Sequence, residues 1–170
     1  MTTSSEERGS LEHALANWKL GQASVAQVVR LAAEMGRQKF REGIPTLTEF
    51  LENTEATVRY AAAVSLGIDL HYRPATTKLL TLLREDTDED VRDAAIAALQ
   101  ALWEDSKDPT VIRALAQSSI NDSDASTRAF AYKALLVVNG ISVEERFELL
   151  GKQIPVDISR IENILRETAQ

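Results

Sequence analysis

Val58-Arg59-Tyr60-Ala61-Ala62 and Val91-Arg92-Asp93-Ala94-Ala95 decide the fold, because each is a copy of a Val-Arg-x-Ala-Ala pentad. A further copy is Val29-Arg30-Leu31-Ala32-Ala33, and a weaker fourth is Thr127-Arg128-Ala129-Phe130-Ala131. The four copies begin 29, 33 and 36 residues apart, which is the period of a solenoid built from stacked helix pairs. The repeat therefore predicts an all-α chain.

Each pentad opens an apolar stripe with the i, i+3, i+4, i+7 spacing of a helix that buries one face, and another amphipathic segment precedes it. Asp108-Pro109 and Thr87-x-x-Asp90 are typical helix starts. Glycines mark the helix ends, where a left-handed residue is expected: Gly21, Gly36, Gly67 and Gly140. We expect ten helices in five pairs, over residues 6–18 with 24–36, 43–53 with 55–68, 74–84 with 88–103, 109–120 with 124–138, and 142–152 with 157–168.

The register of the first pair has two solutions. Aligning the pentads places Val29 opposite Val58, whereas aligning Gly36 with Gly67 places Gln27 there. The sequence alone leaves both open.

Composition limits the class of protein. A chain of 170 residues with 44% hydrophobic and 26% charged residues is typical of one globular domain, and we expect a single domain over 1–170. The absence of cysteine excludes a disulfide scaffold, a thiolate zinc site and a cysteine nucleophile. No signal peptide and no apolar run of membrane-spanning length is visible, so the cytoplasm is the expected compartment and no membrane partner is expected.

These repeats resemble HEAT repeats, in particular the short bacterial type named for phycobilisome lyase subunits. The likeness rests on the pentads, on Leu66-Gly67, on Ile44-Pro45-Thr46-Leu47 and on the acidic turn 88–90. It covers about residues 25–138. It implies a right-handed α-α superhelix of about five helix pairs, with approximate bounds 6–36, 43–68, 74–103, 109–138 and 142–168 and with degenerate capping pairs at both ends.

Several chemistries are disfavoured by the residues themselves. The acidic run 85–90 has Val91 where a calcium loop needs its turn glycine. His13 and His71 are isolated and are not followed by Glu, unlike the His-Glu pairs of HEAT-like di-iron hydroxylases. The net charge of −7 in residues 43–108 opposes nucleic acid, which HEAT-like DNA glycosylases bind on a basic face. We expect no catalytic residues, no metal and no cofactor.

The recurring arginines are predicted to be structural. They recur with the repeat, so we expect them to pair with turn carboxylates of a neighbouring repeat: Arg30, Arg59, Arg92 and Arg128. Asp88 and Asp90 are the acids expected to serve Arg59.

The second helix of each pair is expected to line a concave surface. Apolar and aromatic residues between its buried stripes would form a protein-binding groove, unless superhelical twist buries them between neighbouring helices. The residues expected there are Tyr60, Val64, Asp93, Ile96, Gln100, Trp103, Tyr132, Lys133 and Leu136.

The sequence thus favours a non-catalytic scaffold that binds a basic or amphipathic segment of a partner protein on its concave surface. Two alternatives remain open. One is a subunit similar to the phycobilin lyases or another accessory factor of chromophore proteins, and the other is an acidic inhibitor or immunity protein that blocks a basic partner.

Overall fold

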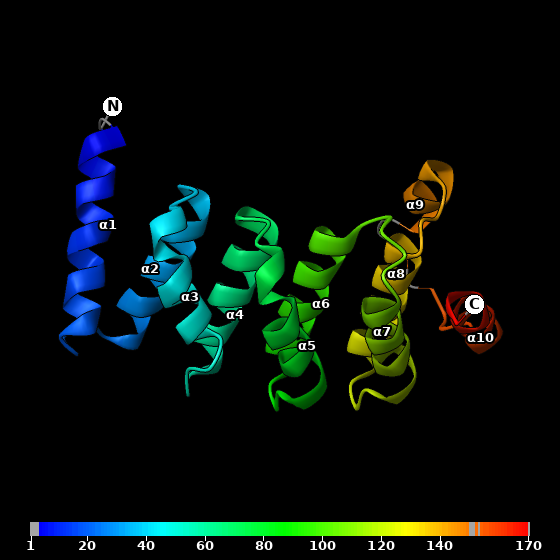
Figure 1. Ribbon diagram of the computed structural model, residues 1–170. Helices are drawn as coiled ribbons and strands as arrows, with labels where there is room; N and C mark the ends of the chain where they lie inside the picture. Colours follow the sequence, from blue (N-terminus) through cyan, green and yellow to red (C-terminus); the bar gives the residue numbers. More distant parts are fainter. Residues whose placement is uncertain (1–3, 150–151, 153, 170) are drawn as a thin grey trace.

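The computed structural model describes residues 4–149, 152 and 154–169, and Figure 1 shows its helices standing side by side along one long axis. Within this part of the chain the regular structure is helical throughout. The α-helices are α1 (Ser4–Lys19), α2 (Val25–Arg37), α3 (Ile44–Phe50), α4 (Ala56–Val64), α5 (Thr76–Glu85), α6 (Glu89–Trp103), α7 (Pro109–Asn121), α8 (Ala125–Val138), α9 (Val143–Leu149) and α10 (Ile158–Thr168). The all-α solenoid predicted from the repeat is confirmed.

The second helices of the first four pairs form a continuous row. Each of α2, α4, α6 and α8 packs on the next, and these contacts are more extensive than those between successive first helices. Closer spacing on one side curves a stack of helix pairs toward that side, so the second helices line the inner face. The core runs through the whole stack, and its largest fully buried side chains include Met35, Phe50 and Ile96.

The last two helices depart from the predicted pairing. Helix α10 packs on α7 and is seen nearly end-on in Figure 1, whereas α9 stands beside the end of α8. An ion pair between Arg160 and Glu145 joins the two helices. The expected helix 142–152 is described as far as Leu149, and residues 150, 151 and 153 lie outside the described part. The fifth pair is therefore not a regular repeat.

The register of the first pair matches neither sequence alignment. Val28 is buried like Val58, and Arg30 is exposed like Tyr60, so the first true copy begins one residue before its Val-Arg pentad. A π-helix over Ser65–Asp69 follows α4, and such a turn holds about one extra residue. Because of it, Gly67 lies one residue further along its repeat than Gly36 does.

Two of the four glycines expected in left-handed conformation serve another purpose. Gly21 and Gly140 do have positive φ angles, of 68° and 83°. Gly67 instead lies where two second helices approach closely, and a Cβ atom there would be 2.2 Å from the Ala98 Cβ. Gly36 similarly faces Ser65, whose hydroxyl donates a hydrogen bond to the Ala32 carbonyl at 2.9 Å. The left-handed expectation is wrong for these two positions.

Candidate functional site

Two arginines tie successive repeats together through bidentate ion pairs. Arg59 donates through Nε and Nη2 to the Asp86 carboxylate, with both distances at 2.7 Å. Arg92 donates in the same way to Asp122, at 2.9 Å. All four side chains are at most 14% exposed. Each pair joins a second helix to the turn of the next repeat, so these arginines are structural.

The acid that serves Arg59 differs from the two expected from sequence. Asp88 caps α6 by accepting a hydrogen bond from the Val91 amide, and Asp90 is exposed in the first turn of that helix. Asp86 lies two residues earlier, where its carboxylate also accepts the Asp88 amide. Burial alone would raise the pKa of Asp86, but the bonds from Arg59 and the Asp88 amide outweigh it and hold that pKa below its usual range.

The series of ion pairs ends at both sides of the central repeats. Arg128 donates through Nη1 to the backbone carbonyls of Asp122 and Ser123, but no carboxylate of the described residues lies within ion-pair distance of it. At the other end Asn53 occupies the position of Asp86 and Asp122, and its side chain likewise accepts the amide two residues on. The residue of α2 that corresponds to Arg59 is Val29, so no arginine requires a charged partner at Asn53. Arg30 is exposed instead, and the expectation that it ties two repeats together is wrong.

The surface of the second helices is the candidate binding site. We define the second-helix face by the exposed and half-buried residues that point outward from the row: Arg30, Glu34, Tyr60, Val64, Asp93, Ala97, Gln100, Ala129, Phe130, Lys133 and Val137. The variable residue of the repeat lies on it in each copy, as Arg30, Tyr60, Asp93 and Ala129. Leu31, which the pentad places in that slot, is 3% exposed and belongs to the core.

Three of the residues expected on this face are buried. Ile96, Tyr132 and Leu136 are each at most 3% exposed, so the expectation is wrong for them. Ile96 and Tyr132 lie five residues after the first residue of their copies, as Ala63 does, and all three are buried. Tyr132, on the last helix of the row, lies beside Arg160 of α10. Stacking on both sides widens the buried arc of these helices beyond the stripe that the sequence shows.

The other predicted residues are accessible to different degrees. Tyr60 is 45% exposed, and Val64, Asp93, Gln100 and Lys133 are half-buried. Trp103 is held at a corner between helices, where its indole Nε1 donates to the Thr76 hydroxyl at 2.9 Å and the Arg73 guanidinium lies over its ring at 4.7 Å. Its contacts are therefore with the first helix of its own pair.

Asp93 is the one predicted residue whose carboxylate is poorly accommodated. Its Oδ1 is buried and accepts no hydrogen bond from the described residues. Burial raises the pKa of Asp93, and the negative charges of Asp124 and Asp122 add to this effect, while Thr127 and Arg92 oppose it. The ionised carboxylate of Asp93 therefore lowers the free energy of unfolding.

A groove runs along the outward surface of α8. Its floor consists of Ser126, Ala129, Phe130, Lys133 and Val137. One wall is formed by Gln100 of α6 and by Glu104, which follows that helix. The other is formed by Val143, Arg146, Phe147 and Leu149 of α9, with Ile154 and Pro155. Its two hollows measure about 550 and 720 Å³ and share Phe130 and Lys133. We call this site the α8 groove.

Of the residues of this groove, the sequence predicts only Gln100 and Lys133 on the binding face. Phe130 falls in the apolar stripe of its pentad, which predicts a core residue, yet it is only half-buried. Val143 and Phe147 are 62% and 69% exposed on a helix outside the recognisable repeats. The irregular placement of α9, which no repeat pattern encodes, brings them to the groove.

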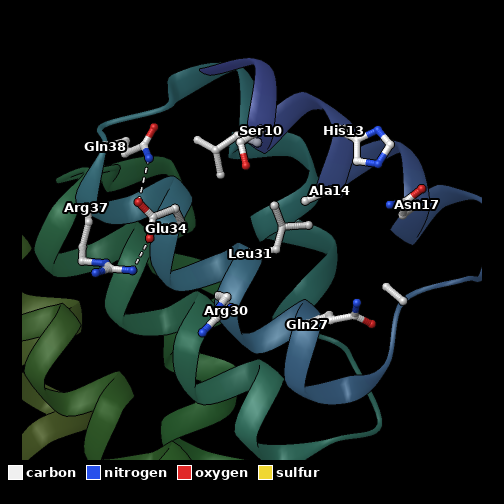
Figure 2. Close-up of a pocket in the computed structure, with 12 residues that line it drawn as sticks. Ser10, His13, Ala14, Asn17, Gln27, Arg30, Leu31, Glu34, Arg37 and Gln38 are labelled. Atoms are coloured by element: carbon white, nitrogen blue, oxygen red, sulfur yellow. Dashed lines mark hydrogen bonds and ion pairs between the residues drawn. The ribbon is translucent and has the colours of Figure 1, made fainter. Parts of the chain in front are cut away.

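A separate hollow of about 700 Å³, far from the α8 groove in sequence, lies between α1 and α2. Figure 2 shows Leu31 and Ala14 near its centre and polar residues around its rim. Glu34 forms an ion pair there with Arg37 and accepts a hydrogen bond from the side-chain Nε2 of Gln38 at 2.6 Å. His13 lies apart from these on α1, so the polar groups do not converge on one point.

Residues 20–100 match a family model described as HEAT repeats. This stretch is therefore similar to HEAT repeats. No curated protein matches the chain significantly. The HEAT-repeat match reaches from the start of α2 into α6, so it contains Arg59 and its ion pair but ends before α8. The α8 groove therefore lies mostly outside the matched repeats.

HEAT repeats commonly mediate protein–protein interaction, and the family generally consists of non-catalytic scaffolds. Among the described residues, no three His, Cys, Asp or Glu side chains gather as metal ligands would. None of the helices in that same part has the length and apolar character needed to span a membrane.

Proposed function

We propose that this protein is a non-catalytic scaffold that binds a segment of a partner protein on its second-helix face. In this proposal the whole chain, 1–170, acts as one interaction domain in the cytoplasm and needs no metal or cofactor. The observation that carries it is the set of apolar side chains that this face leaves accessible. Tyr60 and Val64 of α4 are accessible, and Phe130 and Val137 of α8 line a groove.

The partner segment is amphipathic in this proposal rather than strongly basic. The acidic turns carry most of the negative charge of the middle repeats, but much of that charge already has a structural role. Asp86 and Asp122 are neutralised by arginines, and Asp88 and Asp124 cap helices. Hydrogen bonds from the Ser126 hydroxyl and the Thr127 amide lower the pKa of Asp124 to about 2. A carboxylate already bound by an arginine or by helix amides has fewer oxygen lone pairs left to accept from a basic ligand.

Site-specific photo-crosslinking tests this proposal. A benzophenone amino acid placed at Val64 or Gln100 should crosslink one and the same protein in cells of the source organism, identified by mass spectrometry and then shown to bind as a purified protein. Thr81 and Arg113, exposed on the first helices α5 and α7, are the matched controls and should give no such product. Crosslinks from the control positions alone would contradict the proposal. A bilin absorbance band in the purified chain would instead support the lyase-like alternative.

A further inference from the structure

We propose that the α8 groove binds an amphipathic helix of a partner protein, with one carboxylate in its apolar face pairing with Lys133. This inference rests on the proposed function and names the partner's chemistry at one part of the second-helix face.

The groove presents apolar side chains that the described residues leave exposed. Helix α9 has no fully buried residue, and it presents Val143 and Phe147 at 62% and 69% exposure. Phe130 and Val137 lie opposite on the floor. Exposed aliphatic and aromatic side chains that gather around a concave site mark a place where a partner covers them.

The dimensions of the groove suit a short helix. Its floor extends along α8 from Ser126 to Val137, which is about 17 Å at 1.5 Å per residue. About three turns of a partner helix would lie along this length. Their apolar residues would follow the i, i+3, i+4, i+7 pattern of helix-in-groove recognition.

The charges of the groove distinguish its two cations. Arg146, on the α9 wall, is neutralised by ion pairs with both Glu104 and Asp105. Lys133 lies in the middle of the floor, one turn from Phe130 and one from Val137. Its ammonium donates to the backbone carbonyl of Lys152, and among the described residues no carboxylate lies within ion-pair distance of it.

A positive charge that no carboxylate of the described residues neutralises, placed at the centre of this groove, selects the charge of its ligand. A helix that carries Glu or Asp at the facing position would supply the counter-ion, whereas Lys or Arg there would place like charges together in a desolvated site. Negative charge in the middle of an otherwise apolar helix face is therefore the expected feature of the partner.

Two synthetic helical peptides of equal length test this inference. Both carry Leu at the i, i+3 and i+7 positions, and they differ only at i+4, where one has Glu and the other Lys. Fluorescence anisotropy with the full chain should give a Kd about tenfold or more lower for the Glu peptide. Lys133→Glu should reverse the preference, so that the Lys peptide binds more tightly than the Glu peptide. Phe147→Asp should raise the Kd of both peptides. Tyr60→Ser, on the same face but outside the groove, is the control and should change neither Kd.

Equal binding of the two peptides, or a preference that Lys133→Glu leaves intact, would overturn the inference. So would self-association of the chain that Phe147→Asp abolishes, because a second copy would then occupy the groove. Circular dichroism melting of each variant establishes that it is folded. If the partner crosslinks at Val64 and its affinity is unchanged by Phe147→Asp, the scaffold proposal is supported and the assignment of the α8 groove is wrong. If no protein binds the second-helix face, both the scaffold proposal and the groove assignment are wrong.

Discussion

Arg92 and Asp122 form a bidentate ion pair that joins the third helix pair to the fourth, with side chains only 10% and 5% exposed. A charge left alone at such a site has lost both its solvent and its partner, so removing either residue is costly. We expect Arg92→Ala and Asp122→Ala each to lower the free energy of unfolding by about 2–4 kcal/mol, measured by urea denaturation. The double variant should lose clearly less than the sum of the two, and strict additivity would contradict the pairing.

Arg128 should be less important for stability than Arg92, although both belong to the same repeat position. Its guanidinium bonds only to the backbone carbonyls of Asp122 and Ser123 among the described residues, so its removal leaves no buried carboxylate behind. Arg128→Ala is expected to cost about 1 kcal/mol. Urea denaturation of this variant beside Arg92→Ala provides the comparison, and equal losses would show that the ion pair itself contributes little.

Two substitutions should create a third ion pair of this kind between the first and second repeats. Asn53 occupies the position of Asp86 and Asp122, and the register of the structure places Val29 where Arg59 and Arg92 lie. Asn53→Asp alone should destabilise the protein by up to about 1 kcal/mol, because the new carboxylate has no counter-ion. Adding Val29→Arg should recover this loss in thermal melts. The control pairs Asn53→Asp with Ala26→Arg, an exposed position on the same helix, and should show no recovery.

The sequence predicted the architecture well because the recurring residues are those that build it. Val58, Val91 and their alanines recur since every repeat buries the same stripe. Two kinds of error have physical causes. The Val-Arg pentad at Val29 is out of register with the other copies, since the buried stripe of its helix begins at Val28. The π-helix after α4 separately displaces Gly67 relative to Gly36. The groove depends on α9, which no repeat positions, so neither Phe147 nor its contact with the α8 surface follows from periodicity.

Gly67 should tolerate no side chain. A Cβ atom there would lie 2.2 Å from the Cβ of Ala98 on α6, so two second helices would have to separate. Gly67→Ala is expected to lower the free energy of unfolding by about 1–3 kcal/mol, and adding Ala98→Gly should restore part of it. Gly9→Ala is the control: that position has open space around it, and alanine there should stabilise α1 by up to about 1 kcal/mol.

Asp93 should weaken the fold at neutral pH and cease to do so in acid. Burial raises the pKa of Asp93, so the folded state favours the protonated carboxyl, and the associated stability is lost as the pH rises through that raised pKa. Asp93→Asn removes the charge and keeps the shape, so this variant should be more stable than the parent at neutral pH. The difference should shrink as the pH falls through that raised pKa and should be gone below about pH 3.9, the ordinary pKa of aspartate. Urea midpoints of both proteins across this range provide the measurement. Asp90→Asn, exposed in the first turn of the same helix, removes an equal charge and should bring no gain at neutral pH. A stabilisation by Asp93→Asn that persists unchanged in acid would mean that packing, rather than the buried charge, limits stability at this position.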